Sequence, residues 1–394
     1  MQHYGETAAD LPGVRQQWVR PLPHSSSVNQ LHQQKPSLRG ATVLVTGGAG
    51  FVGSSIARRL AAEDVGARVV ALDNLRRRGS ELNVPRLEAA GVEFRLGDVR
   101  SAEELALDGR AIDLIVECAA EPSVMAGYGG GSRYVVDANL GGLVNCLELA
   151  RERKSRILFL STSRVYPVAR VNQLAVVETE SRYALAGQPG IVGASAAGIS
   201  EDFSLRGVRT LYGTTKLAGE LLLEEYAAFG VEYVTTRFGV IAGPWQMGKV
   251  DQGVFSLWMS RHVFGGSLRY QGWGGQGKQV RDVLHIDDAC DLLLAQLADW
   301  PAVSGRTWNA GGGLANSLSL AETTALCEEI SGTRLALSSD EATHPSDVRV
   351  YITDQRALTA ALGWSPQRPA RRVLEDLHAW MTANAQELAP VFSA

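Results

Sequence analysis

The stretch ATVLVTGGAGFVGSSIARRLAAE, residues 41–63, joins a short apolar run, a glycine-rich turn and an amphipathic helical segment. The glycines have the spacing Gly47-x-x-Gly50-x-x-Gly53. Glycine permits a tight turn and close approach of backbone N–H groups, and the positive N-terminal end of the helix that follows attracts a pyrophosphate. The order of strand, turn and helix predicts a dinucleotide-binding loop more strongly than a tight turn without a ligand.

Four more short apolar runs rich in Val, Ile and Leu follow at intervals that each leave room for a helix. Runs that are apolar on both faces are typical of parallel strands covered by helices on both sides. We therefore predict an α/β fold, a Rossmann-type doubly wound parallel sheet, which VEYVTTRF (231–238) continues. The five runs are ATVLVT (41–46), RVVAL (68–72), VEFRL (92–96), DLIVEC (113–118) and RILFLS (156–161).

The chain divides into three parts by composition. Residues 1–39 are rich in Gln, His, Ser and Pro without an apolar period, which predicts a flexible N-terminal extension outside the fold. Residues 40–240 carry the regular alternation of strands and helices, and we predict that they form the NAD-binding Rossmann domain. Residues 241–394, with glycine-rich connections, predict mainly a smaller C-terminal substrate-binding lobe, with some return of the chain to the sheet.

Composition excludes several classes of protein. The 394 residues are 45% apolar and carry a formal net charge of −4. Such a charge gives no overall positive electrostatic potential that would attract nucleic acid or an anionic membrane surface. No apolar run approaches the ~20 residues of a membrane helix, and no secretory signal is recognisable, which predicts a cytoplasmic protein. The four cysteines are far apart, and no cluster of metal ligands is present, so we expect neither disulfides nor a metal site.

Asp73 ends the second apolar run, twenty residues beyond Gly53. A carboxylate there accepts hydrogen bonds from the hydroxyls of an adenosine ribose and repels a 2′-phosphate, which favours NAD over NADP. The arginines 76–78 complicate this prediction, because an arginine is the usual partner of that phosphate; a solvated loop is the alternative. Asp98, after the third run, is a candidate contact for the adenine amino group or a residue that caps its own loop.

Tyr212 and Lys216 in YGTTK (212–216) lie one helical turn apart at the start of a predicted helix. A free phenol loses its proton near pH 10, so a tyrosine base at neutral pH needs roughly 4 kcal/mol of stabilisation of its phenolate. A nearby lysine and a positive nicotinamide ring supply such stabilisation. Thr162 directly follows the run RILFLS and offers a hydroxyl to the substrate alcohol. Thr162, Tyr212 and Lys216 together predict a hydride-transfer site.

With these motifs in this order, the chain resembles the extended short-chain dehydrogenase/reductase family, whose members act on nucleotide-diphosphate sugars. The similarity runs from about residue 41 to the C-terminus. Within the family the chain resembles most the epimerases that convert CDP-paratose to CDP-tyvelose at C2. The family-wide segments are TGGAGFVG (46–53), GDV (97–99), NLGGLVNCLE (139–148), STSRVY (161–166) and YGTTK. The segments shared with that subgroup are DNLRRRG (73–79), ETESRY (178–183), VDQG (250–253), GKQVRDVLH (277–285), NSLSL (316–320) and SDVRVYITD (346–354).

The resemblance implies a role for each matching residue. Tyr212 is the base, Lys216 its partner and Thr162 the active-site hydroxyl. Arg281 and Arg349 are expected at the substrate diphosphate, with salt bridges to Asp282 and Asp347 as the alternative. The implied cofactor contacts are Gly47, Gly50, Phe51, Val52, Gly53, Asp73, Asn74, Asp98, Val99, Ala119, Ala120, Tyr212 and Lys216. The other implied substrate contacts are Glu121, Thr162, Ser163, Asp251 and Gln252.

Some positions of this chain depart from the family pattern, and they bear on which of the family's reactions the chain catalyses. Dehydratases carry Asp-Glu directly after the active-site threonine, and decarboxylases keep the glutamate; here Ser163 and Arg164 stand there. Val240 replaces the usual asparagine of the R-x-x-N element after Arg237. We therefore predict an NAD-dependent epimerase of a nucleotide-diphosphate sugar that acts through a keto intermediate, and the resemblance to the CDP-paratose epimerases implies that it acts at C2. The alternatives are an NAD(P)-dependent nucleotide-sugar reductase or dehydrogenase, and a dinucleotide-binding protein without catalysis.

Two predicted helices bear on assembly. The segments NLGGLVNCLELA (139–150) and TTKLAGELLLEEYA (214–227) resemble the helices that form a four-helix dimer interface in relatives. The resemblance therefore implies a homodimer.

Overall fold

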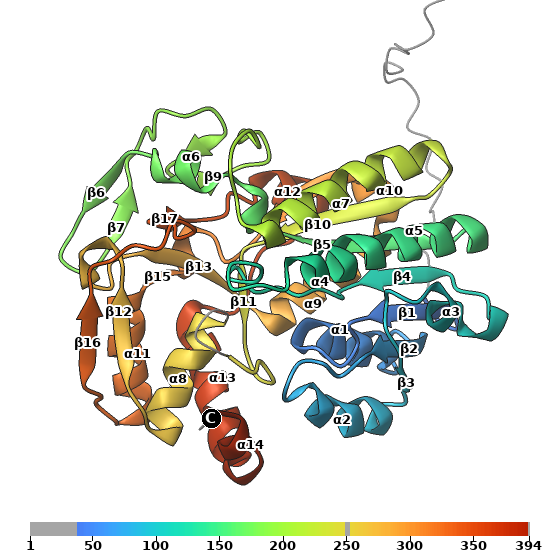
Figure 1. Ribbon diagram of the computed structural model, residues 1–394, viewed down its shortest axis with the longest axis horizontal. Coiled ribbons are helices and arrows are strands. Elements are labelled where there is room, and N and C mark those ends of the chain that lie inside the picture. The colour runs from blue at the N-terminus through green and yellow to red at the C-terminus, as the bar shows by residue number, and fades with distance from the viewer. Residues whose placement is uncertain (1–37, 249–252, 393–394) are drawn as a thin grey trace, which may run out of the picture. The chain divides into compact units, whose positions relative to one another are not determined.

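The computed structural model describes residues 38–248 and 253–392, which belong to one compact unit (Figure 1). The extension predicted for residues 1–39 lies outside the described residues except for its last two. Asp251 and Gln252 also lie outside them. Within these ranges no helix is both long enough and apolar enough to cross a membrane.

A seven-stranded sheet of parallel strands organises the larger part of the molecule, and the predicted doubly wound fold is confirmed. The first strand lies inside the sheet, and the chain proceeds outward from it first in one direction and then in the other. The point of reversal lies between β1 and β4. In spatial order the strands are β14 (Arg306–Ala310), β10 (Tyr233–Phe238), β5 (Arg156–Thr162), β4 (Leu114–Glu117), β1 (Thr42–Thr46), β2 (Arg68–Asp73) and β3 (Glu93–Leu96).

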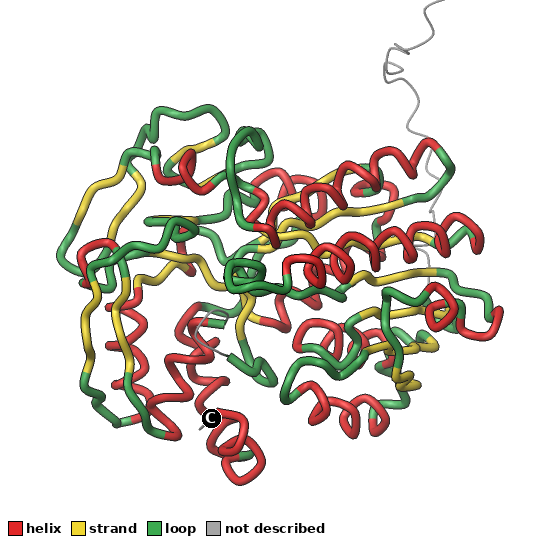
Figure 2. Tube along the Cα trace, in the orientation of Figure 1, coloured by secondary structure: helices red, strands yellow, loops and turns green. Residues whose placement is uncertain are grey.

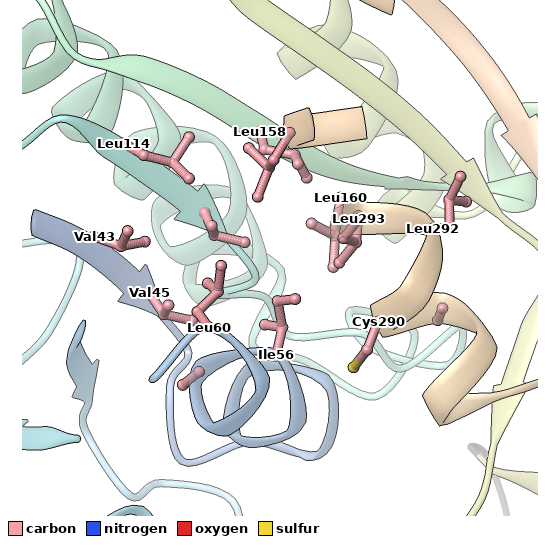
Figure 3. Close-up of a cluster of buried hydrophobic side chains, with 14 of the residues drawn as sticks. Val43, Val45, Ile56, Leu60, Leu114, Leu158, Leu160, Cys290, Leu292 and Leu293 are labelled. Atoms are coloured by element: carbon pink, nitrogen blue, oxygen red, sulfur yellow. The ribbon is translucent and has the colours of Figure 1, made fainter. Parts of the chain in front are cut away.

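Helices cover both faces of this sheet, because alternate strand residues are apolar on opposite sides (Figure 2). Val43 and Val45 pack on the face shown in Figure 3, and Leu44 packs on the other. The first face is covered by α1 (Phe51–Ala61), α2 (Val84–Ala89), α9 (Ile286–Ala298), α10 (Trp300–Val303) and α12 (Arg356–Leu362). The second face is covered by α3 (Ala102–Leu105), α5 (Gly142–Arg153) and α7 (Leu211–Ala228), and the short α4 (Ser132–Val136) precedes α5.

The smaller lobe is built around a second sheet and a separate apolar cluster. Its central strand β13 pairs in parallel with β11 and β17 and antiparallel with β15. The strands of this sheet are β11 (Val240–Ala242), β13 (Val280–His285), β15 (Ser317–Ser319) and β17 (Val350–Tyr351), while β12 (Leu268–Gln271) and β16 (Leu337–Asp340) form a separate two-stranded sheet of the lobe. Its helices are α8 (Val254–Phe264), α11 (Leu320–Ser331), α13 (Ala370–Ala383) and α14 (Ala385–Phe392).

The chain crosses between the two sheets more than once. After the first strands of the small lobe it returns to the large sheet as β14, which pairs with β10. The segment between β5 and α7 leaves the large sheet and contacts the small lobe. Tyr183 donates its backbone N–H to Lys278 O, and Ile199 donates its backbone N–H to Ile352 O. That segment contains α6 (Val168–Asn172), β6 (Val176–Glu178), β7 (Tyr183–Leu185), β8 (Ala194–Ser195) and β9 (Gly198–Ile199).

Candidate active site

A cavity of about 1180 Å³ lies along the carboxyl ends of the large sheet and extends to the small lobe. Its walls include Trp245, Arg261 and Leu320 from the small lobe. Every residue assigned to the cofactor from the sequence lines it: Gly47, Gly50, Phe51, Val52, Gly53, Asp73, Asn74, Asp98, Val99, Ala119, Ala120, Tyr212 and Lys216. Four predicted substrate residues line it as well: Glu121, Thr162, Ser163 and Arg281.

The glycine loop packs too tightly for any other residue at its third glycine. A Cβ atom on Gly53 would lie 2.1 Å from Gly47 O, and Gly47 itself has φ of +61°. The start of α1 is thereby held directly against the end of β1. Backbone N–H groups at a helix start, free of side chains, form the cradle that a pyrophosphate requires, so these residues fit a dinucleotide.

Asp73 holds the loop as well as facing the cavity. Its Oδ2 accepts a hydrogen bond from Ala49 N at 3.1 Å, and its Oδ1 accepts one from Leu75 N at 2.8 Å. Burial raises the pKa of the Asp73 carboxyl, although these backbone hydrogen bonds oppose the rise. The carboxyl group is therefore fixed at the end of β2, where a ribose contact is expected.

Asp98 makes the contacts of a loop-capping residue. Its carboxylate pairs with Arg100 at 2.7 Å and accepts hydrogen bonds from Arg100 N and from Asn74 Nδ2. The side-chain hydrogen bond from Arg100 is the main reason that the pKa of Asp98 lies well below its usual range. Because both carboxylate oxygens of Asp98 accept hydrogen bonds from Arg100 and Asn74, the structure favours the loop-capping role over the contact with adenine, which was the other role considered from the sequence.

The arginines 76–78 are anchored to the protein, and all three line the cavity. The Arg76 guanidinium lies 4.0 Å from the ring centre of Tyr134. Arg77 Nη2 donates to Met247 O at 2.9 Å, and Arg78 donates to Pro390 O. This loop therefore links the large sheet to the small lobe. From the sequence we had considered a contact with the 2′-phosphate of NADP or a solvated loop, and this role differs from both.

The turn after β5 and the start of α7 bring the three predicted catalytic residues to one wall of the cavity. Thr162 Oγ1 accepts a hydrogen bond from Arg164 N at 3.2 Å, which leaves its own hydrogen free to donate. Thr210 caps α7 through Gly213 N at 3.1 Å. A Cβ atom on Gly213 would lie 2.1 Å from Arg164 O, so glycine lets α7 begin against this turn. The start of α7, with Tyr212, is thus held against the turn that follows Thr162, and both residues line the cavity.

Lys216 forms a buried ion pair with Glu117, the last residue of β4. Its Nζ lies 3.0 Å from Glu117 Oε2, and the two side chains are 2% and 1% exposed. Burial raises the pKa of Glu117, and the charge of Lys216 opposes the rise. The sequence carries one signal for this pair, since Glu117 directly follows the apolar residues Leu114–Val116 of the run DLIVEC.

Asn139 is a second residue that the sequence analysis did not assign. It is fully buried in a π-helical turn, Asp137–Gly141, and such turns are frequent at functional sites. Its amide accepts from Glu121 N at 2.7 Å and donates to Thr215 Oγ1 at 3.1 Å. Asn139 therefore ties the loop after β4, which carries Glu121, to the helix that carries Tyr212.

A further buried ion pair lies one turn beyond Lys216. Arg237 on β10 binds Glu220 on α7, with Nη2 and Oε2 2.6 Å apart, and Ser161 Oγ donates to the same carboxylate. Burial lowers the pKa of Arg237, but its bonds to Glu220 raise it by more. This pair joins α7 to β10 beneath the cavity, since neither Arg237 nor Glu220 lines it.

Two arginines, Arg164 and Arg281, line the cavity toward the small lobe. Arg281 Nη2 pairs with Asp347 Oδ1 at 2.8 Å, so the salt-bridge alternative holds for Asp347. Arg164 Nη1 donates to Ser346 O at 3.2 Å, and burial lowers the pKa of Arg164 to about 10. No carboxylate among the described residues lies within ion-pair distance of Arg164. The charges of Arg281 and Asp347 act on its guanidinium group, which can still donate to an anionic ligand.

Arg349 departs from its predicted place, since it does not line the cavity. Its Nη2 donates to the carbonyl oxygens of Asn172 and Leu174, and its guanidinium lies 5.4 Å from the ring centre of Trp273. The strand β17 directs this side chain toward the segment between β5 and α7. The predicted diphosphate contact by Arg349 is thus not part of the assembled site, where Arg164 stands with Arg281.

Known proteins with similar sequences include two epimerases. The chain is 29% identical to CDP-paratose 2-epimerase of Salmonella typhi over 353 residues, which are 86% of this chain and 99% of that protein. It is 25% identical to UDP-glucose 4-epimerase of Neisseria meningitidis, across 87% of this chain and 97% of the relative.

Solved structures share the fold. The DesIV dTDP-glucose 4,6-dehydratase of Streptomyces venezuelae, solved with NAD bound, superposes with a TM-score of 0.70 at 26% identity, covering 89% of this chain and 99% of the other. UDP-glucuronic acid 4-epimerase from Bacillus cereus, solved with UDP-glucuronic acid and NAD, has a TM-score of 0.70 at 24% identity, with coverages of 87% and 99%.

Residues 43–311 match the NAD dependent epimerase/dehydratase family. The match spans the glycine loop, Asp73, the three residues of the predicted hydride-transfer site and the return of the chain to the large sheet as β14. The predicted cofactor, NAD, is thereby confirmed. This chain belongs to the NAD dependent epimerase/dehydratase family, as its glycine loop and its Tyr212-x-x-x-Lys216 element indicate.

Proposed function

We propose that this protein is an NAD-dependent epimerase that inverts C2 of a nucleotide-diphosphate sugar. The observation that carries the proposal is the grouping of Thr162, Tyr212 and Lys216 on one wall of the cavity that the glycine loop also lines. NAD, when bound, supplies the acceptor and donor of a hydride. The chain's own residues must then move one proton and hold the sugar.

Tyr212, as a phenolate, takes the proton from the C2 hydroxyl group, and C2 becomes a carbonyl carbon. Thr162 donates its free hydroxyl hydrogen to the same oxygen, whose charge changes during the reaction. Lys216 supplies the positive charge that favours the phenolate. After the keto sugar presents its opposite face, Tyr212 returns the proton to the oxygen. No net oxidation results.

Two observations favour epimerisation at C2 over the other reactions of the family. A dehydratase removes water from the sugar and needs an acid and a base beside the active-site threonine. Ser163 and Arg164 stand there, and neither suits that work near neutral pH. The choice of C2 rests on similarity to CDP-paratose 2-epimerase of Salmonella typhi along nearly its entire length.

The nucleotide-diphosphate part of the substrate fits the small-lobe end of the cavity. Arg281 and Arg164 both line it and present guanidinium groups, which bind phosphate oxygens in a bidentate manner. We propose CDP-linked deoxyhexoses as the first substrates to test, because the Salmonella typhi relative is named for CDP-paratose.

A sugar substrate labelled with deuterium at C2 tests the reaction. CDP-paratose carrying this label should give the C2 epimer with the deuterium retained on C2, because the hydride leaves and returns without exchange with water. NMR of the product measures both the configuration and the label. Washout of the deuterium would contradict the mechanism. Stoichiometric consumption of added NADH or NAD would show a reductase or dehydrogenase instead.

Tyr212→Phe tests the base. Because general acid–base catalysis contributes typically about 10²–10⁴-fold, we expect kcat to fall by about that factor, with NAD binding retained. Tyr226→Phe is the matched control: Tyr226 lies on the same helix, and its hydroxyl donates to Glu148 Oε1 at the surface. It should keep its activity. A Tyr212→Phe variant with wild-type kcat would remove Tyr212 from the proposed role.

Asp73→Asn tests the choice of cofactor. Loss of the negative charge should weaken NAD binding by about tenfold and strengthen NADP binding, because repulsion of the 2′-phosphate is removed. Isothermal titration calorimetry measures both affinities. Asp64→Asn, on an exposed loop beyond α1, is the control and should change neither. Unchanged NAD and NADP affinities in Asp73→Asn would show that this carboxylate does not face the ribose.

We also propose a homodimer through α5 and α7. Leu221 and Phe229, on or directly after α7, are 56% and 62% exposed, which is unusual for large apolar side chains. Leu221→Arg should therefore shift the protein from dimer to monomer in sedimentation equilibrium. A monomeric wild-type protein, or a dimer unaffected by this change, would contradict the assignment of the interface.

A further inference from the structure

The ion pair between Glu117 and Lys216 lies beneath the proposed site. Lys216 lines the cavity, whereas Glu117 does not. Glu117 ends β4 beside the point where the sheet reverses direction, opposite Thr46 on β1 and Phe159 on β5. Glu117 therefore meets the active site through the ammonium group of Lys216, 3.0 Å from its Oε2, and through the backbone of Ala119.

Burial disfavours the charge of Lys216, and the Phe159 ring, a weaker partner than a carboxylate, favours it. The Lys216 side chain is 2% exposed, and its Nζ lies 4.4 Å from the ring centre of Phe159. Among the described residues, Glu117 is the one carboxylate within ion-pair distance of it. A lysine buried without a partner tends to lose its proton, because desolvation disfavours the charged form. A neutral lysine cannot stabilise a phenolate.

We propose that Glu117 is a positioning residue for the reaction: as the counter-ion of Lys216, it keeps the ammonium group charged and fixed one helical turn from Tyr212. This inference rests on the proposed function, in which Tyr212 is the base. It adds a residue of β4 to the machinery, and it explains why a carboxylate lies buried at the end of an apolar strand.

The other titratable groups around the pair leave its charge to Glu117 and Lys216. Cys118 and Cys146 feel both charges, but burial raises the pKa of each thiol well above neutral pH, so both thiols stay uncharged. On α7, Glu220 is occupied by Arg237. From the turn after β5, Arg164 contributes a positive charge near Tyr212. Replacement of Glu117 therefore acts on its partner Lys216 and leaves the charges of these other groups unchanged.

Glu117→Gln in the enzyme with its bound cofactor tests the inference. Absorbance of tyrosinate is followed during a pH titration, and subtraction of the Tyr212→Phe titration isolates the ionisation of Tyr212. We expect this ionisation to move to higher pH in Glu117→Gln, by about one unit or more, because Lys216 loses its charge. We also expect kcat to fall about tenfold or more, with KM changed less than kcat.

Three variants separate positioning from stability. Glu220→Gln removes the carboxylate of the other buried pair on α7 and should lower thermal stability without moving the ionisation of Tyr212. Glu117→Asp keeps the charge and should restore part of kcat. In a Lys216→Met background, Glu117→Gln should have no further effect on the ionisation of Tyr212. Comparison of Lys216→Met with the double variant therefore tests the inference even if Glu117→Gln alone folds poorly.

An ionisation of Tyr212 that is unchanged, or that moves to lower pH, in Glu117→Gln would overturn the inference. A further shift in the Lys216→Met background would do the same, because Glu117 would then act on Tyr212 without Lys216. These outcomes differ from a failure of the proposed function, which a fully active Tyr212→Phe variant would reveal.

Discussion

Parallel strands bring their carboxyl ends to one edge of the sheet, and the chemistry of this protein depends on how closely the backbone can pack at that edge. Several contacts are tight enough to exclude a Cβ atom, and two of them position the site. Gly53 holds the start of α1 against the end of β1, and Gly213 holds the start of α7 against the turn after β5. The first contact forms the pyrophosphate cradle, and the second holds the start of α7, with Tyr212, against the turn that follows Thr162. The cofactor site and the proposed base are thus fixed by backbone packing.

Buried charges at the same edge are arranged in pairs that reach across different elements. Glu117 of β4 binds Lys216 of α7, and Glu220 of α7 binds Arg237 of β10. One partner of each pair lies on α7, so this helix is joined electrostatically to two strands of the large sheet. Removal of one partner from a buried ion pair lowers the free energy of unfolding by more than the intact pair contributes to it, because the remaining charge is left buried without a partner. The pairs thereby specify where α7 lies.

The sequence was sufficient for the features that have a local pattern. The glycine spacing, the apolar runs and the Tyr212-x-x-x-Lys216 element each follow from a few neighbouring residues, and the predicted parallel sheet and cofactor are confirmed. Partners distant in sequence could not be deduced. Glu117 and Lys216 are 99 residues apart, and nothing local indicates their contact. Arg349 matched a motif, yet the course of β17 directs it to carbonyl groups outside the cavity. The short strands β6–β9 lack a strong apolar alternation, and long-range backbone pairing with the small lobe stabilises them.

The central claim is that the sugar is oxidised and reduced again within one cavity. Rapid mixing of the enzyme with a CDP-linked deoxyhexose, followed by absorbance of the reduced nicotinamide, tests it most directly in a single turnover. The account predicts a transient rise of this absorbance that decays as the epimer forms, with the bound cofactor oxidised at the end. Formation of the epimer by an enzyme stripped of its nicotinamide cofactor, or absorbance that rises and persists with a keto product, would contradict it.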